Sequence, residues 1–100
     1  MTTKDDARRY LGNVSPEQSF WVSNGHVLKN LSELANALQD IRGDVYIYHA
    51  NKDKNDFSKW IEEVIGDKVL ANELLSSRNK ESAFKKIKNR ISILKKKAVL

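Results

Sequence analysis

Residues 48–75 read YHANKDKNDFSKWIEEVIGDKVLANELL and hold the densest apolar periodicity of the chain. Five apolar residues recur there at intervals of three and four positions, which places them on one face of a helix: Phe57, Trp60, Ile61, Val64 and Ile65. Such a face must be buried, so Phe57 and Trp60 are predicted to be core residues rather than a stacking platform for a base or sugar. After Gly66-Asp67, the run Val69, Leu70, Ala71, Leu74 and Leu75 repeats the spacing. The two runs predict a pair of helices, antiparallel or steeply angled.

Capping signals divide the chain before this stretch into further helices. Thr3, with Asp6, begins a short helix that stops at Gly12, and Asn30-Leu31-Ser32-Glu33 begins another that stops at Gly43. Between them, the box Ser15-Pro16-Glu17-Gln18 predicts a helical turn or two through residues 20–22, ending at Asn24-Gly25. Because Phe20 and Trp21 are adjacent, a helix cannot bury both, and we expect one of them to be partly exposed.

Residues 44–49 are ambiguous, since their β-branched and aromatic residues favour a strand. A lone strand has nothing to pair with, so we predict a helical turn here. Asn55 and Asp67 are the expected caps of the next two helices, and Asn79 begins the last one. That last helix carries an apolar seam formed by Phe84, Ile87, Ile91, Leu94 and Ala98. The prediction is a single all-α domain over residues 1–100, a compact bundle of five or six helices with a long basic C-terminal helix.

Charge is segregated along the chain. Residues 1–77 hold nine Lys and Arg against twelve Asp and Glu, whereas residues 78–100 hold nine against the single Glu81. Residues 1–77 thus have a net charge of −3 and residues 78–100 a net charge of +8. The positive net charge of the chain, +5, therefore comes from the region of the C-terminal helix. Segregation of this kind is typical of a surface that meets nucleic acid, an anionic membrane or an acidic protein.

The basic helix favours a non-enzymatic protein that binds nucleic acid, with DNA as the expected ligand. Clustered cations on a regular helix bind phosphates by releasing counterions, and with few aromatic neighbours such binding has little sequence specificity. The competing interpretation is a solvated surface that keeps a small protein soluble. The predicted contact residues are Lys85, Lys86, Lys88, Arg90, Lys95, Lys96 and Lys97.

An alternative function is a protein-interaction module or a homodimer. In this interpretation the seam from Phe84 to Ala98, together with an exposed Ile93 or Trp21, pairs with a helix of a partner.

His49 lies near two carboxylates, Asp53 and Asp56, and such a group could bind a divalent metal or act as an acid and base. A zinc site needs three or four ligands, and His26 lies in a distant loop, so no metal site is predicted. The simpler interpretation is that His49 packs at a helix junction and hydrogen-bonds a carboxylate or a helix end, which fixes the turn into Asn55.

Composition excludes several classes of function. The chain has no cysteine, which excludes disulfides, thiolate zinc sites and a cysteine nucleophile. It has no glycine-rich phosphate loop and no serine–histidine arrangement, so we expect neither an enzyme nor a cofactor. No apolar run approaches the roughly 20 residues that span a bilayer, and the start MTTKDDARR is too polar for a secretory signal. A cytoplasmic protein is therefore expected.

The order of motifs over about residues 20–95 resembles a small prokaryotic family, common in archaea, that is classed as a domain of unknown function. The matching pattern is NLxEL, YH, NDFxxW and DxxLAxxL followed by a charged helix, carried here by residues 30–38, 48–49, 55–60 and 67–74. The resemblance implies a common fold but no activity. It also implies that His49, Asn55 and Asp56 form one recurring feature, either a structural knot or a ligand site. The last helix is more basic here than in the family, where acidic residues are common.

Overall fold

The computed structural model describes residues 2–99. Six α-helices follow in order within this range: α1 (Lys4–Leu11), α2 (Leu31–Asp40), α3 (Gly43–His49), α4 (Asp56–Trp60), α5 (Lys68–Leu74) and α6 (Lys80–Val99). A 3₁₀ turn, η1 (Pro16–Gln18), precedes the short strands β1 (Phe20–Trp21) and β2 (Val27–Leu28), and a π-helical segment, η2 (Ile61–Ile65), continues α4. The predicted compact all-α bundle with a long last helix is confirmed.

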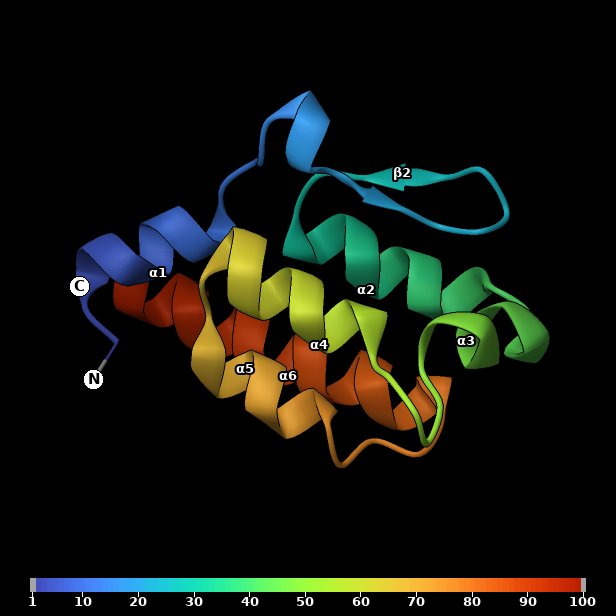
Figure 1. Cartoon of the computed structure of the whole chain (residues 1–100). Coiled ribbons are helices and arrows are strands. Elements are labelled where there is room, and N and C mark those ends of the chain that lie inside the picture. The colour runs from blue at the N-terminus through green and yellow to red at the C-terminus, as the bar shows by residue number, and fades with distance from the viewer. Residues whose placement is uncertain (1, 100) are drawn as a thin grey trace.

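Helix α6 runs along the length of the molecule and is the element on which the others pack (Figure 1). Helix α1 lies beside its C-terminal half, where Arg8 Nε donates to the carbonyl of Ala98 at 3.1 Å. Helices α2 and α5 also contact α6. The seam predicted from the periodicity faces this core, and Ile87 and Leu94 are wholly buried. The apolar face of α6 is therefore used within the chain.

The stripe of residues 57–65 supplies the other half of the core. Phe57, Trp60, Ile61 and Ile65 are buried, and Val64 packs against them partly exposed. The indole Nε1 of Trp60 donates to the carbonyl of Gln18 at 2.7 Å, so the ring is buried with its polar atom satisfied. The prediction that Phe57 and Trp60 are core residues is confirmed.

The predicted helical turn through residues 20–22 is wrong, because this segment is a strand. Phe20 and Trp21 pair antiparallel with Leu28 and Val27 of β2. Phe20 is buried and Trp21 is 69% exposed, as the alternation of a strand demands. The connection turns at Gly25, whose φ of 99° favours glycine. A hairpin thus satisfies both the adjacent aromatics and the Asn24-Gly25 turn, and the expectation that one aromatic is exposed is confirmed.

Two finer predictions also need correction. Helix α2 ends at Asp40, because Ile41 takes an extended conformation that buries its side chain, so Gly43 begins α3 instead of ending α2. Val69 and Leu75 are exposed, and the buried face of α5 consists of Leu70, Ala71 and Leu74 alone. Val69 and Leu75 lie on opposite sides of that narrow face. By contrast, the helical choice for residues 44–49 is confirmed by α3.

A buried ion pair joins α5 to α6. Asp67 accepts from Arg90 through Nε at 2.7 Å and Nη2 at 3.0 Å, and both side chains are less than 10% exposed. Asp67 Oδ1 also accepts the backbone N–H of Leu70, which makes the same carboxylate the predicted cap of α5. Arg90 Nη2 reaches the hydroxyl of Thr2, so the pair also ties the segment before α1 to α6. Among the described residues, no buried side-chain nitrogen or oxygen lacks a hydrogen-bond partner, as burial of such a pair requires.

We predict that Arg90→Met lowers the free energy of unfolding by about 3–5 kcal/mol, because it leaves the Asp67 carboxylate buried without its cation. The double variant Asp67→Asn with Arg90→Met should recover much of this loss, since asparagine still caps α5 and no charge stays buried. Urea unfolding followed by circular dichroism measures the three values.

Arg42→Met is the matched control, because Arg42 pairs with Asp44 while both side chains are largely exposed. Its effect should stay below about 1 kcal/mol. If Arg42→Met and Arg90→Met lowered the free energy of unfolding equally, the buried ion pair would contribute no more to stability than the exposed one.

Candidate functional site

Four predicted contact lysines lie on the exposed surface of α6: Lys85 and Lys96 are roughly opposite its core, and Lys88 and Lys95 border the buried seam on one side. Lys85, Lys88, Lys95 and Lys96 are exposed, whereas Ile87 on the other side is fully buried. From Lys85 to Lys96 the helix axis rises about 16 Å at 1.5 Å per residue. One strand of DNA rises by about 3.4 Å per nucleotide, so this length corresponds to roughly five phosphates. The four lysines, which we call the surface row, spread over about 100° of the helix circumference and extend over a length on the scale of a nucleic-acid backbone.

The remaining three predicted residues are placed differently. Arg90 lies in the interior, held by Asp67, so its guanidinium is not available to a phosphate at the surface. Lys86 is partly buried and donates to the carbonyl of Glu73 and the hydroxyl of Ser76. Lys97 is also partly buried. The surface row therefore consists of four lysines, whereas Lys86 and Lys97 border the buried seam on its other side.

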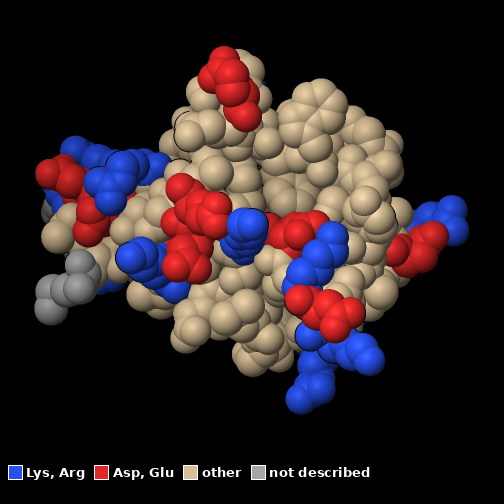
Figure 2. All heavy atoms as spheres, viewed as in Figure 1, with Lys and Arg blue, Asp and Glu red and all other residues tan. Residues whose placement is uncertain are grey.

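No acidic side chain of residues 2–99 forms an ion pair with the four exposed lysines. Glu81 is the only carboxylate on α6 itself. The face seen in Figure 2 is different, since Lys and Arg are interspersed there with Asp and Glu. The positive potential is thus concentrated along α6, as the charge segregation of the sequence indicated.

His49 joins the hairpin to the helices. Its Nε2 accepts the backbone N–H of Ser23 at 2.9 Å, and its Nδ1 lies 3.0 Å from Asp56 Oδ2. Because Nε2 is an acceptor, the ring must be neutral with its proton on Nδ1, where it is donated to Asp56. The ring is buried and lies edge-on to Phe20 at 5.2 Å between centroids. The predicted packing of His49 at a helix junction, bonded to a carboxylate, is thus what the geometry gives.

Asn55 and Asp56 complete this junction. Asn55 Oδ1 caps α4 by accepting from Ser58, while its Nδ2 donates to the carbonyl of Leu74 at the end of α5. Asp56 accepts from His49 and from Lys54 Nζ at 3.1 Å. Burial by itself raises the pKa of Asp56, but the hydrogen bonds from His49 and Lys54 outweigh it and hold the pKa below its ordinary value. The carboxylate therefore stays charged and keeps His49 oriented.

Asp53 does not join His49 and Asp56. It lies in the exposed loop between α3 and α4, where its backbone N–H is held by Asn51. His26 is likewise exposed, in the hairpin. Among the described residues, no group of three or more His, Asp or Glu side chains is arranged to hold a metal ion.

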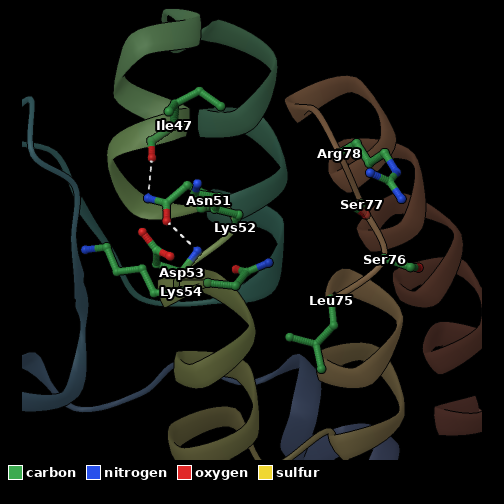
Figure 3. Close-up of a pocket in the computed structure, with 11 residues that line it drawn as sticks. Ile47, Asn51, Lys52, Asp53, Lys54, Leu75, Ser76, Ser77 and Arg78 are labelled. Carbon is green, nitrogen blue, oxygen red and sulfur yellow. Dashed lines mark hydrogen bonds between the residues drawn. The ribbon is translucent and has the colours of Figure 1, made fainter.

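A cleft of about 620 Å³ opens between the loop that follows α3 and the connection from α5 to α6 (Figure 3). Ile47 and Asn51 lie on one wall, and Leu75 and Arg78 lie on the other. Sequence reasoning did not find this cleft, because its walls come from two connections that no periodicity links. The one local signal was Leu75, an apolar residue next to a polar connection.

Among residues 2–99, no helix is both long enough and apolar enough to cross a lipid bilayer.

Comparison of the chain with protein-family models, with curated proteins and with solved structures finds no match in any of the three. The resemblance to a family of unknown function therefore stays a prediction, and the site has to be interpreted from its own chemistry.

We predict that His49 is the Nδ1–H tautomer at pH values near 8, where a free imidazole is neutral. The reason is the Ser23 N–H, which only an unprotonated Nε2 can accept. Long-range ¹H–¹⁵N correlation spectra of the ring nitrogens distinguish the tautomers, and the exposed His26 is the internal reference. A proton found on Nε2 of His49 would contradict the assignment.

Proposed function

We propose that this protein is a non-enzymatic binding protein that contacts the phosphates of nucleic acid, and of DNA in particular, through the exposed face of α6. The observation that supports it most is the row of Lys85, Lys88, Lys95 and Lys96, which has no acidic partner among the described residues. Solubility alone would be served equally well by mixed charges, as on the face in Figure 2. Charges of one sign gathered on one exposed surface favour the binding of a polyanion.

Binding of this kind is electrostatic and weakly specific. Lysine is a compact point charge that contacts phosphate without reading base edges, and no aromatic side chain of α6 is exposed beside the row. Asn89 and Ser92 lie between the lysines on the same exposed face and can donate hydrogen bonds to phosphate oxygens. Residues that the core or other contacts already occupy, above all Arg90, take no part in this mode.

We expect the wild-type affinity for a short mixed-sequence DNA duplex to fall steeply with salt. With four phosphate contacts, the slope of log K against log salt should be about −3.6, or a loss on the order of 10²-fold between 50 and 200 mM. Replacing Lys85, Lys88, Lys95 and Lys96 together by Gln should remove most of this slope, about one unit for each lysine. Fluorescence anisotropy of a labelled duplex at several salt concentrations measures it.

The matched control replaces four exposed lysines outside α6 by Gln: Lys29, Lys52, Lys59 and Lys68. Both variants lower the net charge by the same amount, so a general charge effect would weaken them equally. The proposal requires the control to keep a nearly wild-type slope. Binding that ignores salt, or no binding at low salt, would eliminate it.

For the second candidate, a protein-interaction module or homodimer, fewer apolar residues are exposed than the sequence indicated. The seam of α6 is buried within the chain, so it cannot also pair with a partner. Trp21 at 69% and Ile93 at 45% exposure are the residues on which this candidate rests, because both are large apolar side chains that a partner could reach.

For that candidate we expect Trp21→Ala or Ile93→Glu to abolish self-association while leaving the monomer folded, since both side chains lie at the surface. Sedimentation equilibrium of the wild type and the two variants measures the association, and circular dichroism checks the fold. A complex of unchanged strength in both variants, or a monomeric wild type, would rule out a homodimer through these residues.

A further inference from the structure

The cleft between the α3–α4 loop and the α5–α6 connection has apolar walls that the fold itself does not need. Ile47 is 52% exposed and Leu75 is 64% exposed, and both line the same cavity although they are far apart in sequence. Ala50, which belongs to the buried core, also lines the cleft. With about 620 Å³, the cleft has the volume of a typical small-molecule site. Its apolar part is suited to an aliphatic group.

The walls are held in a fixed relation. Asn55 donates to the carbonyl of Leu74, which ties the loop after α3 to the end of α5. Asn51 donates to the carbonyl of Ile47 and accepts the N–H of Asp53, which shapes the loop itself (Figure 3). Since these amides are already engaged, the cleft is preformed rather than assembled by a ligand.

The charges that remain in the cleft are mainly positive. Helices α3 and α5 both end at the cleft, and the free carbonyls at a helix C-terminus attract cations. Here, however, the carbonyl of Ile47 accepts from Asn51 and that of Leu74 accepts from Asn55. These two carbonyls are therefore already hydrogen-bonded. Lys54 is paired with Asp56, and in Figure 3 Lys54 and the Asp53 carboxylate lie on the side of the loop away from Arg78. Lys52 and Arg78 line the cleft and form no ion pair within residues 2–99. Arg78 in particular presents the planar fork that suits a carboxylate.

From this combination we propose that the cleft binds an organic carboxylate with an aliphatic body, its chain against Ile47 and Leu75 and its charge at Arg78 and Lys52. The carboxylate can belong to a free acid or to the C-terminal residue of a peptide. The site is separate from the lysine row of α6 and does not depend on the nucleic-acid proposal.

The test follows the amide resonances of the ¹⁵N-labelled full chain during titration with butyrate and hexanoate. We expect shifts in residues 47–55 and 75–78, dissociation constants in the millimolar range, and tighter binding by up to about fourfold for each added CH₂ that is buried. Hexylammonium, which has the same chain and the opposite charge, should not shift these residues. Equal binding of hexylammonium, shifts that follow only the lysines of α6, or no dependence on chain length would overturn the proposal.

Two pairs of variants separate the apolar contact from the charge. Leu75→Ser should abolish the chain-length dependence, whereas Val69→Ser, at a comparably exposed residue of α5 outside the cleft, should not. Arg78→Gln with Lys52→Gln should weaken hexanoate at least fivefold, whereas Lys29→Gln with Lys59→Gln should leave it unchanged. The opposite ranking in either pair would contradict the assignment of the site.

A further arm identifies the source of the carboxylate. The peptide Gly-Gly-Leu with a free C-terminus is compared with its C-terminal amide and with hexanoate. Binding of the free peptide at least as tight as that of hexanoate would assign the site to a protein C-terminus, and binding of hexanoate alone would assign it to a free acid. If the amide binds as well as the free peptide, the carboxylate plays no part and the proposal fails.

Discussion

Helix α6 has one apolar face, and the fold depends on burying it. Helices α1, α2 and α5 all pack on this face, and Ile87 and Leu94 lose their entire solvent exposure there. Fully burying a side chain of this size stabilises the native state by about 1.5–3 kcal/mol. Because this face is buried within the domain, only the exposed surface of α6 is available to a binding partner. The exposed surface of α6 carries Lys85, Lys88, Lys95 and Lys96 beside Asn89, Ser92 and Ile93, and this positive charge is why we propose a polyanion rather than a second helix as the partner.

The polar groups of the interior carry several tasks at once. Asp67 caps α5, neutralises Arg90 and, through Arg90, holds Thr2. Because Arg90 is held by Asp67 in the interior, its positive charge does not add to the exposed lysines of α6. A buried pair of this kind contributes less to net stability than its Coulomb attraction suggests, since both ions lose their water. Its clearest effect is positional, because it sets where α5 lies along α6.

His49 likewise links separate segments of the chain through its hydrogen bonds. Its two ring nitrogens hold the hairpin through Ser23 and the start of α4 through Asp56. Asn55 extends the connection to the end of α5. The residues that the family resemblance grouped together therefore form a junction between three segments. The same junction fixes one wall of the cleft, so a structural knot and a ligand site need not be alternatives in this part of the fold.

Much of the fold follows from local sequence. Capping at Thr3, Asn30, Asn55 and Asp67, and the stripes of residues 57–65 and 84–98, depend on interactions within about four residues, so they can be read directly from the chain. The charge of the last helix is equally a property of the sequence. The hairpin was missed because two strands of two residues carry too little periodicity to compete with a nearby capping box.

What only the tertiary structure decided are the pairings between distant residues. The partner of Arg90 is 23 positions away and that of His49 Nε2 is 26 positions away, and neither follows from any local spacing. The cleft likewise exists only because two connections are brought side by side. The sequence by itself determined which helices form, which of their faces are apolar and where the positive charge lies. Which lysines remain free and which residues share a cavity depended on how the helices dock, because docking is governed by contacts that the chain makes only once it is folded.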